Sequence, residues 1–197
     1  TVLEPSLLYG GCPPKELRHK FLMAQESDAA YLTPEALPEG FRLLPLAGHC
    51  MDMVGFRTAE DVVYLADCLS SRETLEKYRI GYIYDVAAYL ATLETVKSMT
   101  AAAFVPAHAE VTADIAPLAQ YNIDTVLEVA ACIVALCAQP RTFEELLKAL
   151  FDRYGMAMSF EQYALVGGTV RSYLTWLKET GRVTAEFADN RMLWRQA

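Results

Sequence analysis

Short apolar runs separated by turn residues predict β-strands in the first half of the chain. Residues 43–46 predict a short strand that lies at an edge or ends early, because Pro45 cannot donate a backbone hydrogen bond. Residues 53–58 and 61–66 predict a hairpin. The apolar pair Phe104-Val105 predicts the next strand. The pattern therefore indicates a small sheet.

A helical spacing of apolar residues then interrupts the strands. Asp85 is predicted as the N-cap of a helix that reaches Met99 with its apolar residues in one stripe. Residues 68–84 hold several charged side chains and are predicted as a loop. The first 40 residues are rich in proline and glycine and show no regular pattern. Strands mixed with helices predict an α/β fold.

The remainder of the chain is predicted to be mostly helical. One helix starts at residue 113 or 117 and reaches residue 138. Thr142 and Glu145 form a capping box at the start of a second helix, and a third covers residues 160–179. Residues 183–187 and 192–194 then predict a terminal hairpin. This order of elements is that of a winged helix.

Composition narrows the class of protein. The chain is 53% hydrophobic and 21% charged, yet no apolar run approaches the roughly 18 residues that a membrane span needs. We therefore expect no membrane association, and we assign the apolar excess to a core or an interface. The net charge of -8 disfavours non-specific binding of nucleic acid. Five scattered cysteines without metal-knuckle spacing indicate the reduced thiols of a cytoplasmic protein.

Three residues that can bind a metal follow apolar strand-like runs. His49 follows the first run, Asp67 the hairpin, and His108 the run that ends at Val105. An α/β scaffold gathers such side chains in one cleft, because its strand ends meet at the same edge. Imidazole and carboxylate groups suit zinc or iron. We therefore expect these three residues to lie together as metal ligands, while Cys50 and Cys68 line the core.

These segments resemble those of the metallo-β-lactamase-fold hydrolases. AGHC at residues 47–50, LAD at residues 65–67 and PAHAE at residues 106–110 match the family's segments in order and rough spacing. The resemblance implies that His49 binds one metal, His108 binds the other and Asp67 bridges both. It implies a divalent metal, with zinc preferred over iron or manganese. It also implies hydrolysis of a small ester, thioester or lactone.

One part of the family pattern is missing. The H-x-H-x-D-H loop has no counterpart, since the chain holds three histidines in all. Residues 1–120 are therefore expected to form the C-terminal half of an αββα sandwich, and residues 121–197 a helical winged-helix-like extension. We expect this fragment to be inactive by itself, because each metal would lack ligands. Since Thr1 is not an initiator residue, we also expect the N-terminus to have been cut or removed.

Two other functions remain open at this point. A non-catalytic interaction module would bury the bare sheet face against a second copy or against a complementing N-terminal segment. A winged-helix regulator would bind DNA, but residues 160–179 offer only Arg171 and Lys178 against Glu161 and Glu179. Nucleic acid is therefore not an expected partner, whereas the intact protein is expected to bind a small-molecule substrate.

Overall fold

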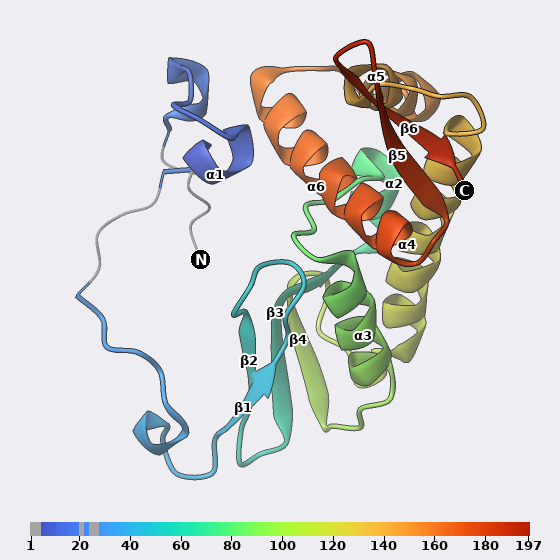
Figure 1. Cartoon of the computed structure of the whole chain (residues 1–197). Coiled ribbons are helices and arrows are strands. Elements are labelled where there is room, and N and C mark those ends of the chain that lie inside the picture. The colour runs from blue at the N-terminus through green and yellow to red at the C-terminus, as the bar shows by residue number, and fades with distance from the viewer. Residues whose placement is uncertain (1–4, 20–21, 24–27) are drawn as a thin grey trace.

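The computed structural model describes residues 5–19, 22–23 and 28–197 of the chain. A four-stranded sheet lies at one end of the molecule, and the last helices of the chain lie at the other (Figure 1). The sheet contains, in spatial order, β1 (Arg42–Pro45), β2 (Val54–Arg57), β3 (Val62–Ser70) and β4 (Ala103–His108). All the predicted strands are thus present, and the α/β class is confirmed.

The strand directions decide which strand ends meet. β1 pairs antiparallel with β2, and β2 pairs antiparallel with β3. β3 in turn pairs parallel with β4. Consequently β1, β3 and β4 all run in the same direction, and their C-terminal ends point to one edge of the sheet.

Helix α3 (Val86–Lys97) covers one face of this sheet. Asp85 caps it as predicted, because its carboxylate accepts a hydrogen bond of 3.0 Å from the Ala88 N–H. Leu93 and Val96 of α3 are fully buried. They share one core with residues from two strands, namely Val63, Leu65 and Phe104.

The opposite face of the sheet carries an apolar row across all four strands. The register places Leu43 beside Phe56, Phe56 beside Tyr64, and Tyr64 beside Val105. Paired residues project to the same side of a sheet, so these four side chains lie together on the face away from α3. Tyr64 is 46% exposed, and the other three are only partly buried. We call this row the open face.

The prediction of a loop over residues 68–84 is wrong for residues 68–70 and 72–78. β3 continues to Ser70, and helix α2 (Arg72–Tyr78) follows it at once. The Ser71 hydroxyl caps this helix by accepting a hydrogen bond of 3.2 Å from the Thr74 N–H. Leu75 is the one buried residue in α2. A single buried position in two turns produces no apolar period, so the sequence pattern does not reveal the helix.

Three helices and a hairpin follow β4 in the predicted order. They are α4 (Ala116–Leu136), α5 (Phe143–Tyr154), α6 (Phe160–Glu179), β5 (Val183–Ala188) and β6 (Arg191–Gln196). Thr142 and Glu145 form the predicted capping box. Asp189 and Asn190 have φ angles of 50° and 58°, the left-handed pair that a two-residue hairpin turn requires.

Helix α4 joins the sheet region to the tail. It begins at Ala116 and passes the expected boundary between residues 120 and 121 without a break, so that division stays a prediction. On length and composition alone α4 could span a membrane, although Asp124 and Glu128 interrupt its apolar sequence. Val129 and Ile133 are fully buried in the same core as β3 and α6, and this packing accounts for the apolar composition.

The N-terminal segment contributes one short helix and two 3-10 turns. Helix α1 (Pro5–Tyr9) lies beside α6 (Figure 1). The turns cover Lys15–Leu17 and Pro34–Ala36. A second, smaller core contains Leu8, Leu17, Leu22 and Ala164, so α6 contacts the N-terminal segment as well as the main core.

Candidate functional site

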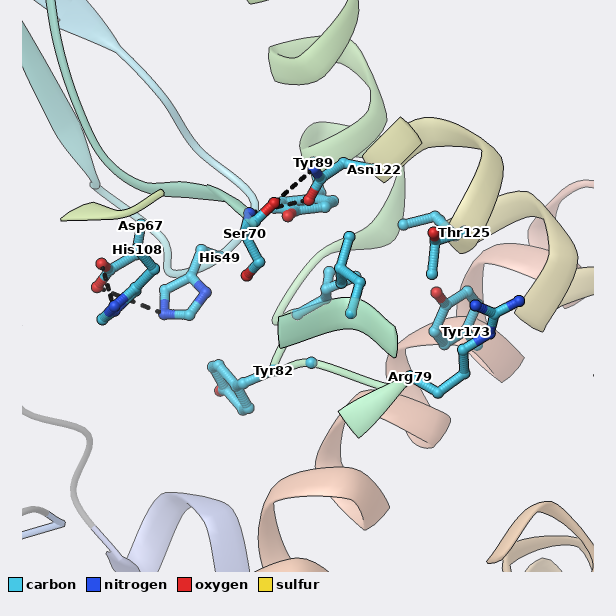
Figure 2. A pocket seen from close by; sticks show the side chains of 14 residues that line it. His49, Asp67, Ser70, Arg79, Tyr82, Tyr89, His108, Asn122, Thr125 and Tyr173 are labelled. Carbon is cyan, nitrogen blue, oxygen red and sulfur yellow. Dashed lines mark hydrogen bonds and ion pairs between the residues drawn. The ribbon is translucent and has the colours of Figure 1, made fainter. Parts of the chain in front are cut away.

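Three parallel strands bring the predicted site residues to one edge of the sheet. His49 lies in the turn after β1, Asp67 lies near the end of β3, and His108 is the last residue of β4. Because these strands run in the same direction, their C-terminal ends adjoin. The structure therefore places the three side chains together, as the sequence predicted (Figure 2).

The turn that carries His49 is fixed against α3. Gly48 has a φ of +127°, and a Cβ at this position would lie 2.3 Å from the Cα of Tyr89. No other residue fits there, because the conformation is strained for an L side chain and the space is filled. The Thr92 hydroxyl also donates a hydrogen bond of 2.7 Å to the Ala47 carbonyl. Both contacts hold the backbone of the turn.

A bulge in β3 turns Asp67 toward the site. In a regular strand, Asp67 would project to the same buried face as Leu65, two residues earlier. The register with β4 shifts around Ala66, whose φ is +47°. The alternation therefore changes by one residue: Cys68 is fully buried, whereas 41% of the Asp67 side chain is exposed.

Asp67 lies between the two imidazoles (Figure 2). Its Oδ1 is 3.1 Å from Nε2 of His108, and its Oδ2 is 4.0 Å from Nε2 of His49. The His49 side chain is 26% exposed and the His108 side chain 64% exposed. The site is thus enclosed on the His49 side and open on the His108 side.

The environment of His49 favours its neutral form. Burial lowers the pKa of His49 below the ordinary value of 6.5, and this outweighs the opposite effect of the Asp67 carboxylate. The nearby Tyr82 backbone also raises the pKa of His49, but less than burial lowers it. The rings of His49 and Tyr82 meet edge to face, with their centres 5.5 Å apart. Neutral imidazole is the form of histidine that binds a metal.

The two thiols beside the candidate ligands face the core, as predicted. Cys50 is 8% exposed and Cys68 is fully buried. Burial, followed by the neighbouring Asp67 charge, raises the pKa of Cys68 to about 12. A thiol that stays protonated is neither a metal ligand nor a nucleophile at neutral pH.

A small cavity extends inward from the site. It holds about 60 Å³, enough for a few water molecules. Asn122 of α4 lines it and is almost completely buried. Its side chain accepts a hydrogen bond of 2.9 Å from the Ser70 N–H and donates one of 2.9 Å to the Ser70 carbonyl, as Figure 2 shows. Asn122 thus ties the end of β3 to α4.

The three candidate ligands suit a divalent metal in kind. Two donors on one zinc ion each lie about 2.0–2.1 Å from it, so they are at most about 4.2 Å apart. Both contacts of Asp67, at 3.1 and 4.0 Å, fall within this limit. Each carboxylate oxygen faces a different imidazole.

Three candidate ligands are too few for a complete metal site. Across residues 5–19, 22–23 and 28–197, no group of three or more His, Cys, Asp or Glu side chains could hold a metal ion. The role of His49, Asp67 and His108 as metal ligands therefore stays a prediction, although their proximity is observed.

The sequence pattern did not single out the residues that support the site. Tyr82 packs against the ring of His49. Asn122 and Thr169 are both buried and both make hydrogen bonds to the backbone next to the site. Each is a polar residue on an otherwise apolar helix face, and such a residue needs a specific partner. That signal could have identified them.

Comparison with known proteins identifies the fold of the chain. No protein-family model and no curated protein matches the chain. Among solved structures, a metallo-β-lactamase family protein from Thermus thermophilus matches with a TM-score of 0.69 and 19% identity, over 98% of this chain and 62% of that chain. A β-lactamase domain protein from Burkholderia ambifaria matches with a TM-score of 0.63 and 16% identity, over 90% of this chain and 52% of that chain. The chain thus spans little more than half the length of these structures.

Proposed function

We propose that this chain, which has the metallo-β-lactamase fold, is the C-terminal half of a metal-dependent hydrolase. In this proposal His49, Asp67 and His108 are its share of the metal ligands. The observation that supports it best is the Asp67 carboxylate, which presents one oxygen to each imidazole at the edge where three parallel strands end. The name metallo-β-lactamase implies a divalent metal in general, and imidazole with carboxylate suits zinc, iron or manganese.

Each side chain has a separate task in this proposal. His49 and His108 provide one nitrogen donor each, and Asp67 provides a shared carboxylate. The Tyr82 ring packs against the His49 ring, and the bulge at Ala66 aims Asp67. When bound, a divalent ion at such a site activates water and polarises a carbonyl or phosphoryl oxygen.

The shape of the site indicates how a substrate would approach. The enclosed cavity of about 60 Å³ has room for water but not for an organic substrate. The exposed His108 side is therefore the side from which a small ester, thioester or lactone would reach the ligands. The acyl class itself comes from the resemblance and is part of the proposal.

The ligand count argues that this chain alone binds metal weakly. A catalytic zinc usually takes three protein ligands plus water, whereas each ion here would have one imidazole and one carboxylate oxygen. Additional ligands would have to come from a complementing segment. After dialysis, elemental analysis should find well under one tightly held metal per chain, and the chain alone should not hydrolyse a generic thioester.

Titration with Co²⁺ or Zn²⁺ tests the ligand assignment. His49→Ala, Asp67→Asn and His108→Ala should each remove the weak binding, whereas His19→Gln should not, since His19 contacts Glu161 instead. Equal binding by Asp67→Asn and the unsubstituted chain would refute the assignment. Stoichiometric zinc together with thioester turnover would show that the chain already holds a complete site.

The open face indicates where a complementing segment would bind. Leu43, Phe56, Tyr64 and Val105 form an apolar row that the described residues leave only partly covered. Burying apolar surface contributes about 25 cal/mol per Å², so a patch of several hundred Å² is worth on the order of 10 kcal/mol. In a two-sheet sandwich, a second sheet packs about 10 Å away from the first. We therefore assign this face to a complementing segment that supplies the second sheet.

Light scattering over a concentration series tests the assignment. The chain alone should self-associate through the open face, and Tyr64→Ser should reduce this association. Tyr78→Ser is the matched control, because Tyr78 on α2 is also 46% exposed. Adding a segment that carries the second sheet should replace self-association by a one-to-one complex. A monomer at micromolar concentration with little dye binding would show that the half-domain interpretation is wrong.

We do not propose that the C-terminal helices bind DNA. Arg171 on α6 lies 3.9 Å from the centre of the Phe143 ring, so its guanidinium is engaged within the protein. Lys178 is then the other basic side chain of this helix, beside Glu179. A salt-dependent gel shift with duplex DNA would contradict this interpretation.

A further inference from the structure

The segment between α2 and α3 links the C-terminal tail to His49. Residues 81–84 form neither helix nor strand, so no regular ladder of hydrogen bonds holds them. Such segments open easily unless side chains tie them down. In Figure 2, Tyr82 of this segment lies between His49 and the ribbon of α6. We call residues 81–84 the bridging loop.

Two side chains of α6 hold the bridging loop. The buried Thr169 hydroxyl accepts a hydrogen bond of 3.0 Å from the Ile83 N–H and donates one of 3.2 Å to the Gly81 carbonyl. Ser172, three residues later and thus on the same helix face, donates one of 2.7 Å to the Tyr84 carbonyl. Three of the loop's four residues are therefore bonded to α6.

The same loop holds His49 from the other side. The His49 ring packs edge to face against the Tyr82 ring, with the ring centres 5.5 Å apart. The backbone N–H of Tyr84 donates a hydrogen bond of 2.9 Å to the carbonyl of Gly48, which precedes His49. The contacts with α3 hold the backbone of this turn, as described above, whereas the bridging loop also contacts the imidazole.

A glycine on α6 lets the loop approach the helix. A Cβ on Gly168 would lie 3.8 Å from the Tyr82 ring, so the ring packs close to the helix backbone. The Tyr82 ring is thus enclosed between α6 and His49. Displacing the loop would change the ring contact that orients the imidazole and the backbone hydrogen bond to Gly48.

From these contacts we infer that Thr169 and Ser172 are positioning residues for His49, acting through the bridging loop. The inference rests on the proposed function for its consequence, because the orientation of His49 matters as that of a metal ligand. It assigns the tail a role in shaping the site. Partners that orient a ligating histidine in this way typically change metal affinity about 10–100-fold when they are removed.

The test compares four variants of the full chain. Thr169→Val keeps the shape of the side chain but removes both hydrogen bonds, and Thr169→Ser restores the hydroxyl. Ser172→Ala removes the other anchor. Thr175→Val is the matched control, since the Thr175 hydroxyl bonds only to the Arg171 carbonyl of its own helix, at 3.1 Å. Thermal unfolding establishes that each variant is folded.

Three readouts follow, and two of them are independent of metal. In the metal-free chain, nitrogen-15 spectra report the proton position on the His49 ring, and His49→Gln identifies its signals. Thr169→Val and Ser172→Ala should shift these signals, and amide exchange at Ile83 should accelerate in Thr169→Val. Their Co²⁺ affinity should fall by about 10-fold or more. Thr169→Ser and Thr175→Val should match the unsubstituted chain in every measurement.

The outcomes separate this inference from the proposed function. If folded Thr169→Val and Ser172→Ala leave the His49 ring signals unchanged, the positioning role is refuted. If the unsubstituted chain binds no Co²⁺, the proposed function fails, and the ring signals still decide the positioning role. If Thr169→Val does not fold, the partly buried Ser172→Ala decides it.

Discussion

Replacing Gly48 by alanine should be one of the most damaging single-methyl changes in the chain. Gly48 has a φ of +127°, and an added Cβ would lie 2.3 Å from the Cα and 2.4 Å from the backbone N of Tyr89. The obstacle is helix backbone, so no side-chain rotation can relieve it. Strain at such a φ costs about 1–3 kcal/mol, and overpacking adds about 1–3 kcal/mol. We therefore expect Gly48→Ala to lower the free energy of unfolding by roughly 2–6 kcal/mol.

Urea denaturation measures this loss, with Gly81→Ala as the matched control. Gly81 lies in the bridging loop, a Cβ there would meet nothing within 4 Å, and its φ is not in the left-handed region. The control should stay within about 0.5 kcal/mol of the unsubstituted chain. If Gly48→Ala also stays within about 0.5 kcal/mol at an unchanged denaturant slope, the fixed turn beneath His49 is disproved.

Three further predictions follow from the same contacts. Asn122→Ala should cost about 2–4 kcal/mol in urea denaturation, because it leaves the Ser70 N–H and carbonyl without partners, and an unchanged midpoint would contradict this. Iodoacetamide at neutral pH should modify the exposed Cys12 and spare Cys68, because burial raises the pKa of Cys68 to about 12. Rapid labelling of Cys68 in the folded chain would contradict its burial. The hydrogen bonds of Glu145 to Thr142 lower the pKa of Glu145 below 4.5, so its contribution to stability is present above pH 4.5 and is lost as the pH falls through the lowered value. Glu145→Gln should therefore flatten the acid limb of the stability curve, and an identical limb would refute this linkage.

The sequence predicted helix starts and turns correctly where one or two residues determine them. Thr142 and Glu145 predicted a helix start because a capping box satisfies backbone donors within a single turn. Asp189-Asn190 predicted a hairpin because few residues accept a positive φ. Helix α2 was missed for the converse reason, since Leu75 alone is buried in it and no period results.

The candidate site was predictable in its residue types and in their convergence. His49, Asp67 and His108 each follow an apolar strand, and strands that run in the same direction end at a common edge. The sequence could not show that Asp67 faces the site, because strict alternation would have buried it beside Leu65. The bulge at Ala66 decides this, and a bulge depends on pairing with β4, about 40 residues later in the chain.

By itself, the sequence determined the α/β class, most helix and strand positions, and the three residues at the strand ends, because these depend on local propensity and apolar period. Only the tertiary structure decided how those residues are held. Thr169 contacts Ile83 and Gly81 from more than 80 positions away, and Asn122 reaches Ser70 from another helix. Such contacts carry no local pattern, since they arise from the packing of α4 and α6 against the sheet. The orientation of His49 is therefore a property of the folded chain as a whole.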